Sequence, residues 1–347
     1  MMESKYPYSY AQLQALVEAR LRETGHPERI PNWAMISGGA ESGATWQRNY
    51  EAYRALGFRQ RLIHEDVQPD LSASMCGQKV SMPVAAAPMA GALEMTHENA
   101  FVEMGIGCSR AGVATSLGFP AGATHVRDMR EVCSSVFRII KPHRNEAVLV
   151  EELKRAEAEG AFAVGVDLDS ICGLKTGDDA GHFGEITKPY SVDMLKEIRS
   201  CVHVPFIVKG IMSGEDAEAA RLAGADAIVV STHAGYALDC TLSPLEVLEE
   251  IRSAIGRDME VYVDSGIRRG TDVVKAMAMG ADAVLVGRLM VWGLLIGGAD
   301  GVEWMFHLLR EEMARSMQLM GVSNWKELDR SCLVALNAMG REMLCRG

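Results

Sequence analysis

Eight short apolar runs, separated by helical segments, constrain the fold of this chain more than any other feature of its sequence. They are PVAAAP (83–88), GVATS (112–116), VFRII (136–140), FAVGVD (162–167), PFIVKG (205–210), AIVVSTH (227–233), VYVDSG (261–266) and AVLVG (283–287). Most of their residues are β-branched or small, which is typical of strands buried on both faces of a parallel sheet. A doubly wound open sheet would show the same alternation, but eight strands favour a closed α/β fold, the (β/α)₈ TIM barrel.

The segments between the runs carry helix-capping signals. In residues 243–256, for example, Pro244 stands at the first helical position and Gly256 at the end. An amphipathic run near the C-terminus, GVEWMFHLLREEMARSMQLMG, predicts a further helix. No linker-like or low-complexity tract interrupts the chain. We therefore predict one domain, with an N-terminal extension over 1–80, a barrel core over 81–300 and C-terminal helices over 301–347.

The chain is acidic, with 35 basic and 46 acidic residues and a formal charge of −11. An acidic surface repels nucleic acids and anionic membranes, so small molecules are the expected ligands. The eight cysteines form no CxxC or Cys/His metal spacing, which predicts free thiols and no metal site. Because the sequence shows neither a signal-peptide pattern nor an apolar stretch of membrane-spanning length, we expect a cytoplasmic protein without a membrane span.

Polar residues end several of the predicted strands, and active sites of barrels lie at the C-terminal ends of their strands. Asp167, Lys209, His233, Asp264 and the pair Gly287-Arg288 hold such positions. His233 is the natural acid or base near neutral pH, and Asp167 is placed to orient its ring. Lys209 needs an acceptor, which either a cofactor carbonyl or a carboxylate at the barrel mouth would provide.

A glycine-rich segment with two arginines, DSGIRRGTDVVKAM, follows the seventh predicted strand. Gly266 and Gly270 flank Arg268 and Arg269 just before a helix, and Arg288 follows the eighth strand. Loops after the last two strands hold a phosphate in many barrels, through backbone N–H groups and arginine side chains. The alternative interpretation is a glycine-containing turn with solvated arginines.

From about residue 32 to 332 the sequence resembles the FMN-dependent α-hydroxy-acid oxidase and dehydrogenase family, which includes glycolate oxidase and lactate oxidase. The densest similarity lies in PFIVKGI, AIVVSTHAGYALD, VYVDSGIRRGTDVVKAMAMGADAVLVGR and MARSMQLMGVSNWKEL. The resemblance implies FMN as cofactor, His233 as catalytic base, Asp167 as its orienting carboxylate and Lys209 at the flavin N1/O2 edge. It further implies cofactor contacts by Pro88, Met89, Ala90, Ser231, His233, Gly235, Asp264, Ser265, Gly266, Arg268, Gly287 and Arg288.

The substrate side departs from this family pattern. Tyr236 stands where the family has an arginine for the substrate carboxylate, and Met35 stands near the position of a family tyrosine. Arg138 and Ile140 replace a glutamine and a tyrosine of the third strand, and Lys175 is the cation nearest to a second family arginine. Because the loss of the arginine at position 236 leaves a substrate carboxylate without a charge-assisted partner, a simple lactate or glycolate substrate is disfavoured. A lysine at position 175 is no simple substitute for a bidentate arginine. Arg138 or Lys175 remains as an alternative partner for a carboxylate.

These features predict an oxidoreductase in which His233 removes a proton while the adjacent C–H of an alcohol, hydroxy acid or amine delivers hydride to flavin N5. Lys209 would stabilise the reduced flavin. Two alternatives stay open, a flavin-dependent isomerase similar to type 2 isopentenyl diphosphate isomerase and a flavin-binding protein without catalysis. The electron acceptor is O₂, a quinone or a protein. The resemblance implies a homo-oligomer, and we expect a tetramer.

Overall fold

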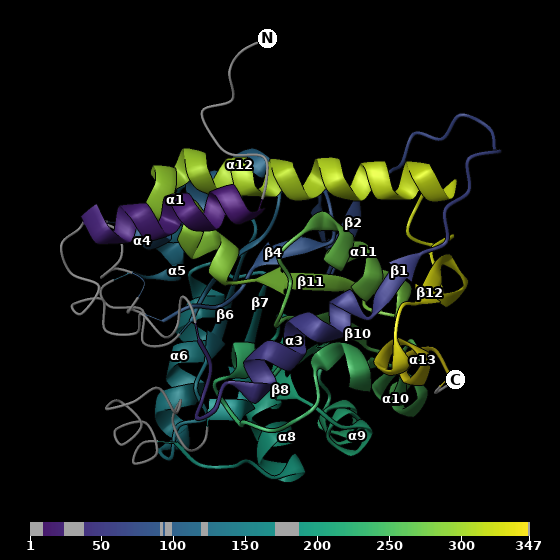
Figure 1. Cartoon of the computed structure of the whole chain (residues 1–347). Helices are drawn as coiled ribbons and strands as arrows, with labels where there is room; N and C mark the ends of the chain where they lie inside the picture. The colour runs from purple at the N-terminus through teal and green to yellow at the C-terminus, as the bar shows by residue number, and fades with distance from the viewer. Residues whose placement is uncertain are drawn as a thin grey trace.

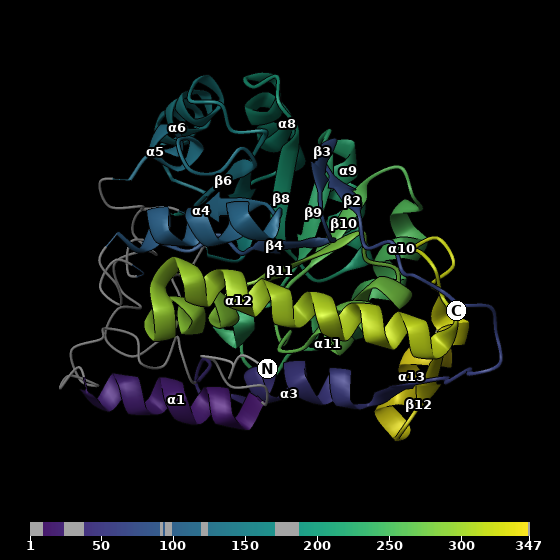
Figure 2. The ribbon, with the colours of Figure 1, turned by 90° about the horizontal axis from the view of Figure 1, so that it is seen from above.

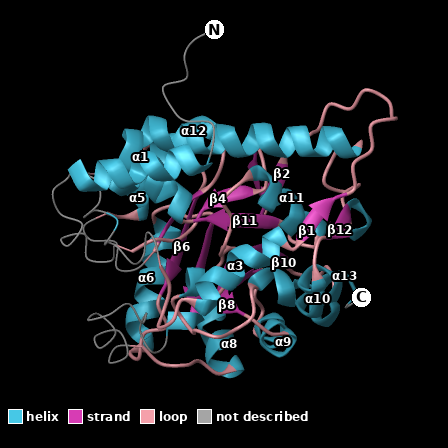
Figure 3. Cartoon of the chain, viewed as in Figure 1, coloured by secondary structure: helices cyan, strands magenta, loops and turns pink. Residues whose placement is uncertain are grey.

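The computed structural model describes residues 10–23, 38–90, 93, 99–118, 124–170 and 187–345. Its centre is a parallel sheet of eight strands, which Figure 3 shows in magenta inside a layer of helices. In spatial order these strands are β4 (Val84–Ala86), β11 (Ala283–Val286), β10 (Glu260–Val263), β9 (Ala227–Val230), β8 (Phe206–Ile211), β7 (Ala163–Asp167), β6 (Val136–Ile140) and β5 (Thr115–Leu117).

The first and last strands of this order meet and close the sheet. Ala85 forms a parallel bridge with Ala114, and the N–H of Ala86 donates to the carbonyl of Ala114 at 3.0 Å. The Ser116 hydroxyl also donates to the Ala86 carbonyl at 2.7 Å. The predicted (β/α)₈ barrel is therefore confirmed, and every predicted apolar run overlaps one of its strands.

Helices cover the outside of the barrel, as the views from two directions show (Figures 1 and 2). Between Ser243 and Gly256 the capping signals act as predicted, because the Ser243 hydroxyl accepts from the N–H of Leu245 and Pro244 is the first helical residue. The described helices of this layer are α4 (Ala100–Ala111), α5 (Val126–Arg130), α6 (Glu146–Ala158), α8 (Val192–Ser200), α9 (Gly214–Leu222), α10 (Pro244–Ile255), α11 (Gly270–Ala278) and α12 (Arg288–Met320).

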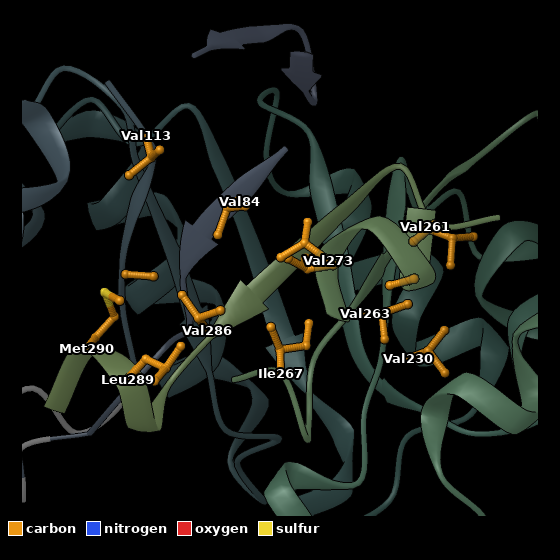
Figure 4. Packing of buried hydrophobic residues seen from close by; sticks show 14 of the residues in the cluster. Val84, Val113, Val230, Val261, Val263, Ile267, Val273, Val286, Leu289 and Met290 are labelled. Carbon is orange, nitrogen blue, oxygen red and sulfur yellow. The ribbon is translucent and has the colours of Figure 1, made fainter. Parts of the chain in front are cut away.

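Side chains of the strands alternate between the inside of the barrel and the helix layer. Ala163, Ile207 and Val229 belong to the apolar cluster inside the barrel. The outward valines of β4, β10 and β11 pack near α11 and α12 (Figure 4). A hairpin of β2 (Ala73–Met75) and β3 (Gln78–Val80) adds Met75 and Val80 to the inner cluster, and the N–H of Cys76 bonds Glu260 at the start of β10. The hairpin thus covers the N-terminal ends of the strands.

Segments from both extensions pack together outside the barrel. Strands β1 (Leu56–Phe58) and β12 (Leu333–Ala335) form an antiparallel pair, and α1 (Tyr10–Glu23) contacts α12. The other helices of the extensions are α3 (Ala44–Arg54) and α13 (Ala338–Cys345).

Helix α12 consists of two helical parts. The first starts at Arg288, directly after β11, and the helical geometry is interrupted at Gly297 and Gly298. The second part contains the predicted amphipathic run, so the predicted boundary at residue 300 lies close to this interruption. By length and composition alone α12 would also suffice to cross a membrane, although the sequence predicted no such span. However, 72% of its apolar window is buried inside the molecule, so it is part of the core.

Candidate active site

A layer of polar side chains replaces the apolar interior at the C-terminal ends of five neighbouring strands. Alternation along the strands places these residues at inward positions, and each is less than a tenth exposed. They are Lys141 after β6, Asp167 of β7, Lys209 of β8, Ser231 after β9 and Asp264 after β10. Buried charges require partners, so this layer is held together by ion pairs.

Asp167 is the centre of this layer. Its two oxygens accept from two ammonium groups, Lys141 at 2.6 Å and Lys209 at 2.8 Å. Burial alone would raise the pKa of Asp167, but the two lysines outweigh it and hold the pKa well below its ordinary value. Burial alone would lower the pKa of Lys209, but Asp167 and the nearby Asp169 and Asp264 hold it above its ordinary value. Both residues are therefore charged at neutral pH.

His233 makes its closest carboxylate contact with Asp169. The distance from His233 Nδ1 to an Asp169 oxygen is 2.7 Å, whereas Asp167 lies 3.5 Å away. The sequence prediction named Asp167 alone as the orienting residue, and the structure corrects it to this extent. Both acids reach the histidine because Asp167 ends β7 and Asp169 lies in the short 3₁₀ helix that follows, Leu168–Ser170.

Lys209 occupies the space between the groups of this cluster. Its Nζ lies 2.8 Å from Asp167, 3.3 Å from Asp169 and 3.3 Å from His233 Nδ1. The ligand atoms of these three residues are close enough together to hold a metal ion. Because an ammonium group already lies among them, we assign the cluster to Lys209 and not to a metal.

The backbone around His233 has an unusual left-handed conformation. Positive φ angles occur at His233 (52°), Ala234 (59°) and Gly235 (89°). The first two are uncommon for residues with a side chain and concentrate at functional sites. The Ser231 and Ser265 hydroxyls hold the turn by accepting from the N–H groups of His233 and Ala234, both at 2.9 Å.

Helix α3 packs against this turn and fixes it from outside. The Asp239 carboxylate accepts from the N–H groups of Ser42 at 2.9 Å and Thr45 at 2.8 Å, at the start of α3. Hydrogen bonds from the Ser42 hydroxyl and the Thr45 N–H hold the pKa of Asp239 well below its usual range. Arg48 of α3 forms two bonds with Glu246 of α10, at 2.7 and 2.8 Å.

Two arginines meet at an aromatic ring on the other side of the barrel mouth. The Arg268 guanidinium lies 3.1 Å from the centroid of the Tyr50 ring, and Arg288 donates to the Tyr50 hydroxyl at 2.7 Å. Arg288 is also the first residue of α12, where the helix dipole favours an anion. Two cations beside a helix N-terminus form a suitable set of donors for a phosphate group.

A small residue, Gly287, ends β11 at an inward position. Among the described residues, a Cβ added to Gly287 would have only Ala87 Cβ within 4 Å, at 3.7 Å. Pro88, Met89 and Ala90 follow β4 beside it and are partly exposed. The small side chains next to Arg288 therefore suit a nucleotide cofactor with a planar ring.

The structure places Arg138 and Ile140, two of the predicted substrate residues, away from the inward face of the barrel. Arg138 donates to the Gly118 carbonyl and pairs with Glu152 of α6 at 3.5 Å, on the outward face of β6. Ile140 belongs to the same outer cluster as the helices. The prediction that these two residues face the substrate was therefore wrong by one position in the strand. The inward residues are Phe137 and Ile139, followed by Lys141.

Tyr236 is buried and lies against Arg288, whose guanidinium is 5.4 Å from the ring centroid. Burial raises the pKa of its hydroxyl. Met35 and Lys175 lie outside the described residues.

Sequence reasoning missed Asp169, Lys141 and Tyr50. Asp169 stands two residues after Asp167, and Lys141 follows its strand run just as Lys209 ends another. A consistent search for charged residues at strand ends would have found Lys141 as well as Lys209. The position of Tyr50 in the N-terminal extension gave no comparable signal.

The fold and this site define a class of cofactor-dependent barrel enzymes, with a pair of arginines after the last two strands and a histidine–carboxylate cluster after the middle ones. The model of the FMN-dependent dehydrogenase family matches residues 27–182 and 173–335. The chain belongs to the FMN-dependent dehydrogenase family, and its cofactor is FMN.

Relatives and solved structures agree with this assignment. The chain is 30% identical to an L-lactate oxidase of Nostoc sp. over 334 residues, which is 85% of this chain and 91% of the relative. It is also 30% identical to 2-hydroxyacid oxidase 1 of Mus musculus over 331 residues, covering 84% and 89% of the two chains. A crystal structure of mandelate oxidase superposes with a TM-score of 0.82 at 28% identity, covering 92% and 96%. These relatives support the predicted oxidoreductase over an isomerase or a non-catalytic flavin protein.

Proposed function

We propose that this FMN-dependent oxidoreductase oxidises the hydroxyl-bearing carbon of a substrate related to 2-hydroxy acids, and that it prefers a neutral group beside that carbon to a free carboxylate. The observation that carries the proposal is the charge of the cluster around His233. The family membership supports the hydroxyl substrate, and the cluster supports the preference for a neutral neighbour.

In this proposal the cofactor is held from the two sides of the barrel mouth. Arg268 and Arg288 would bind the phosphate of FMN, and Lys209 and Ser231 would contact its ring. The residues from Pro88 to Ala90 and Gly287 supply the space for the ring. FMN, when bound, accepts two electrons from the substrate.

His233 is the group that takes the proton of the substrate hydroxyl. Its Nδ1 faces Asp169, so Nε2 is the nitrogen available to a substrate. The positive charge that the ring gains is stabilised by the Asp169 carboxylate, which lies 2.7 Å from Nδ1. A base held in this way acts without reorientation during the reaction.

Among its described residues, the site that a substrate carboxylate would enter has more acidic than basic side chains. Among the described residues, three carboxylates (Asp167, Asp169 and Asp264) stand against two ammonium groups (Lys141 and Lys209). Tyr236, at the position of the family's arginine, adds no cation. A buried charge without a matched partner costs about 2 to 5 kcal/mol, or roughly 30-fold or more in binding.

The test compares an acid with its amide on one carbon skeleton. Anaerobic reduction of the flavin, followed near 450 nm, is measured with mandelate and with 2-hydroxy-phenylacetamide, and then with lactate and lactamide. We expect the amides to reduce the flavin with a kcat/KM at least ~30-fold above that of the acids. His233→Gln serves as the control and should abolish reduction by either compound. Faster reduction by the acids would contradict the charge argument, and failure of all four compounds would contradict the proposed substrate class.

A further inference from the structure

The two acids beside His233 are held by different partners. Asp167 receives two ammonium groups at 2.6 and 2.8 Å, so its charge is largely compensated by Lys141 and Lys209. Apart from His233, the side chains among the described residues that donate to Asp169 are Lys209, at the longer distance of 3.3 Å, and the Ser170 hydroxyl at 3.2 Å. The charge of Asp169 is therefore more available to a histidine that becomes protonated.

Lys141 is the group that fixes Asp167. Its side chain is buried, and its Nζ contacts the Ser170 hydroxyl at 2.5 Å in addition to Asp167. Ser170 in turn bonds Asp167 at 3.2 Å. Lys141 and Ser170 thus bind the Asp167 oxygen that lies nearer to His233, and this oxygen stays 3.5 Å from the ring.

The backbone of β8 makes room for Asp169. Gly210 follows Lys209 at a shift in the strand register and has a φ of +98°. A Cβ at this position would lie 2.7 Å from the Asp169 nitrogen and 2.8 Å from its Cβ. A residue with a side chain would displace Asp169, so the close approach of this acid to His233 depends on a glycine in the neighbouring strand.

We infer that Asp169 is the positioning residue that orients the His233 ring and stabilises its protonated form, while Lys141 confines Asp167 to the role of a structural anchor. This inference rests on the proposed role of His233 as base. The proton passes from the substrate hydroxyl to His233 Nε2, and the Nδ1 proton remains between the ring and Asp169. No atom of Asp167 takes part in the transfer.

The experiment compares two isosteric variants, Asp169→Asn and Asp167→Asn, in the FMN-loaded enzyme. The orienting acid of a histidine is worth about 10²-fold or more in kcat, so Asp169→Asn should lose this much and Asp167→Asn less than about tenfold. Asp169→Glu should recover part of the loss.

The groups that face His233 are Asp167 from β7, Asp169 from the 3₁₀ helix, Lys209 from β8 and Asp264 after β10. Among the substitutions that would remove one of these charges, Asp169→Asn should shift the acid limb of the pH–rate profile furthest toward lower pH.

A second measurement tests the role of Lys141. In Lys141→Met, Asp167 loses its anchor and can approach His233. Adding Asp169→Asn to this variant should therefore lower kcat by a factor at least about tenfold smaller than in the wild-type background. Equal losses in both backgrounds would contradict the part assigned to Lys141.

Ring ¹⁵N resonances of His233, identified by their absence in His233→Gln, report the pairing without any turnover. A larger change of the His233 signal in Asp167→Asn than in Asp169→Asn would overturn the inference. If His233→Gln retained full activity, the proposed function would fail instead, and the ¹⁵N measurement would still decide which acid holds the ring.

Discussion

The two sides of the barrel mouth use opposite means to fix their charged groups. On the phosphate side, Arg268 and Arg288 lie against the ring and hydroxyl of Tyr50, so the cations are held by an aromatic side chain. On the histidine side, Lys141 and Lys209 are held by carboxylates. Cations placed against an aromatic ring keep their positive field for an incoming anion, whereas cations paired with acids are neutralised. This difference supports the proposal that one side of the barrel mouth binds the phosphate of FMN and the other disfavours a substrate carboxylate.

The variant expected to separate the two sides of the barrel mouth most strongly is His233→Gln, which should slow flavin reduction without weakening flavin binding. General acid–base groups contribute about 10²- to 10⁴-fold, so flavin reduction by the best substrate should slow by this factor. Flavin binding should persist, because the phosphate side is unchanged. The flavin absorbance of the purified protein and the rate of its anaerobic bleaching measure the two properties separately. Loss of both together would show that the two sides are not independent.

Asp167→Asn tests the histidine side through stability. The variant leaves two buried ammonium groups without their shared anion, which costs about 3 to 5 kcal/mol of unfolding free energy. Because the folded-state pKa of Asp167 is depressed, its contribution is present above the ordinary aspartate pKa of about 4 and is lost as the pH falls toward the folded value. Denaturant unfolding between pH 3 and 7 should therefore show that the unfolding free energy falls less at low pH in Asp167→Asn than in the wild type. Burial raises the pKa of Asp264, so its contribution to the pH dependence of the unfolding free energy has the opposite sign in both proteins.

The strands were predictable, and the phosphate loop could be proposed, because their signals are local. Buried strands appear as continuous apolar runs, and Gly266 with Arg268 lies within a few residues of one of them. The register of β6 was not predictable in the same way, because both faces of this strand are buried and the pattern does not alternate. Arg138 was therefore placed on the wrong face. The pairing of Asp169 with His233 depends on strands β7 to β9 meeting in space, which no local spacing encodes.

Arg268→Gln and Arg269→Gln form a matched pair on the phosphate side. Arg268 lies on Tyr50 at the barrel mouth, whereas its neighbour Arg269 pairs with Glu312 in α12. A hydrogen bond to a charged group is worth about 1.5 to 3 kcal/mol, so Arg268→Gln should weaken FMN binding by roughly 10- to 100-fold. Arg269→Gln should lower stability and leave FMN affinity nearly unchanged. Titration of the apoprotein with FMN gives both affinities, and equal weakening in the two variants would contradict the assignment of Arg268.

The smallest effect on catalysis is expected from Arg138→Gln, which separates the sequence prediction from the structure. Arg138 pairs with Glu152 outside the barrel, and burial lowers its pKa to about 10. Removing this buried charge should reduce the unfolding free energy by about 1 to 3 kcal/mol. The KM of the best substrate should change by less than about twofold, because a residue without substrate contact contributes no binding energy. Lys141→Gln is the matched comparison from the inward face of the same segment and should change kcat/KM far more. A rise in KM in Arg138→Gln but not in Lys141→Gln would mean that this arginine reaches the substrate. The negative charge assigned to the site around His233 would then be partly balanced by Arg138.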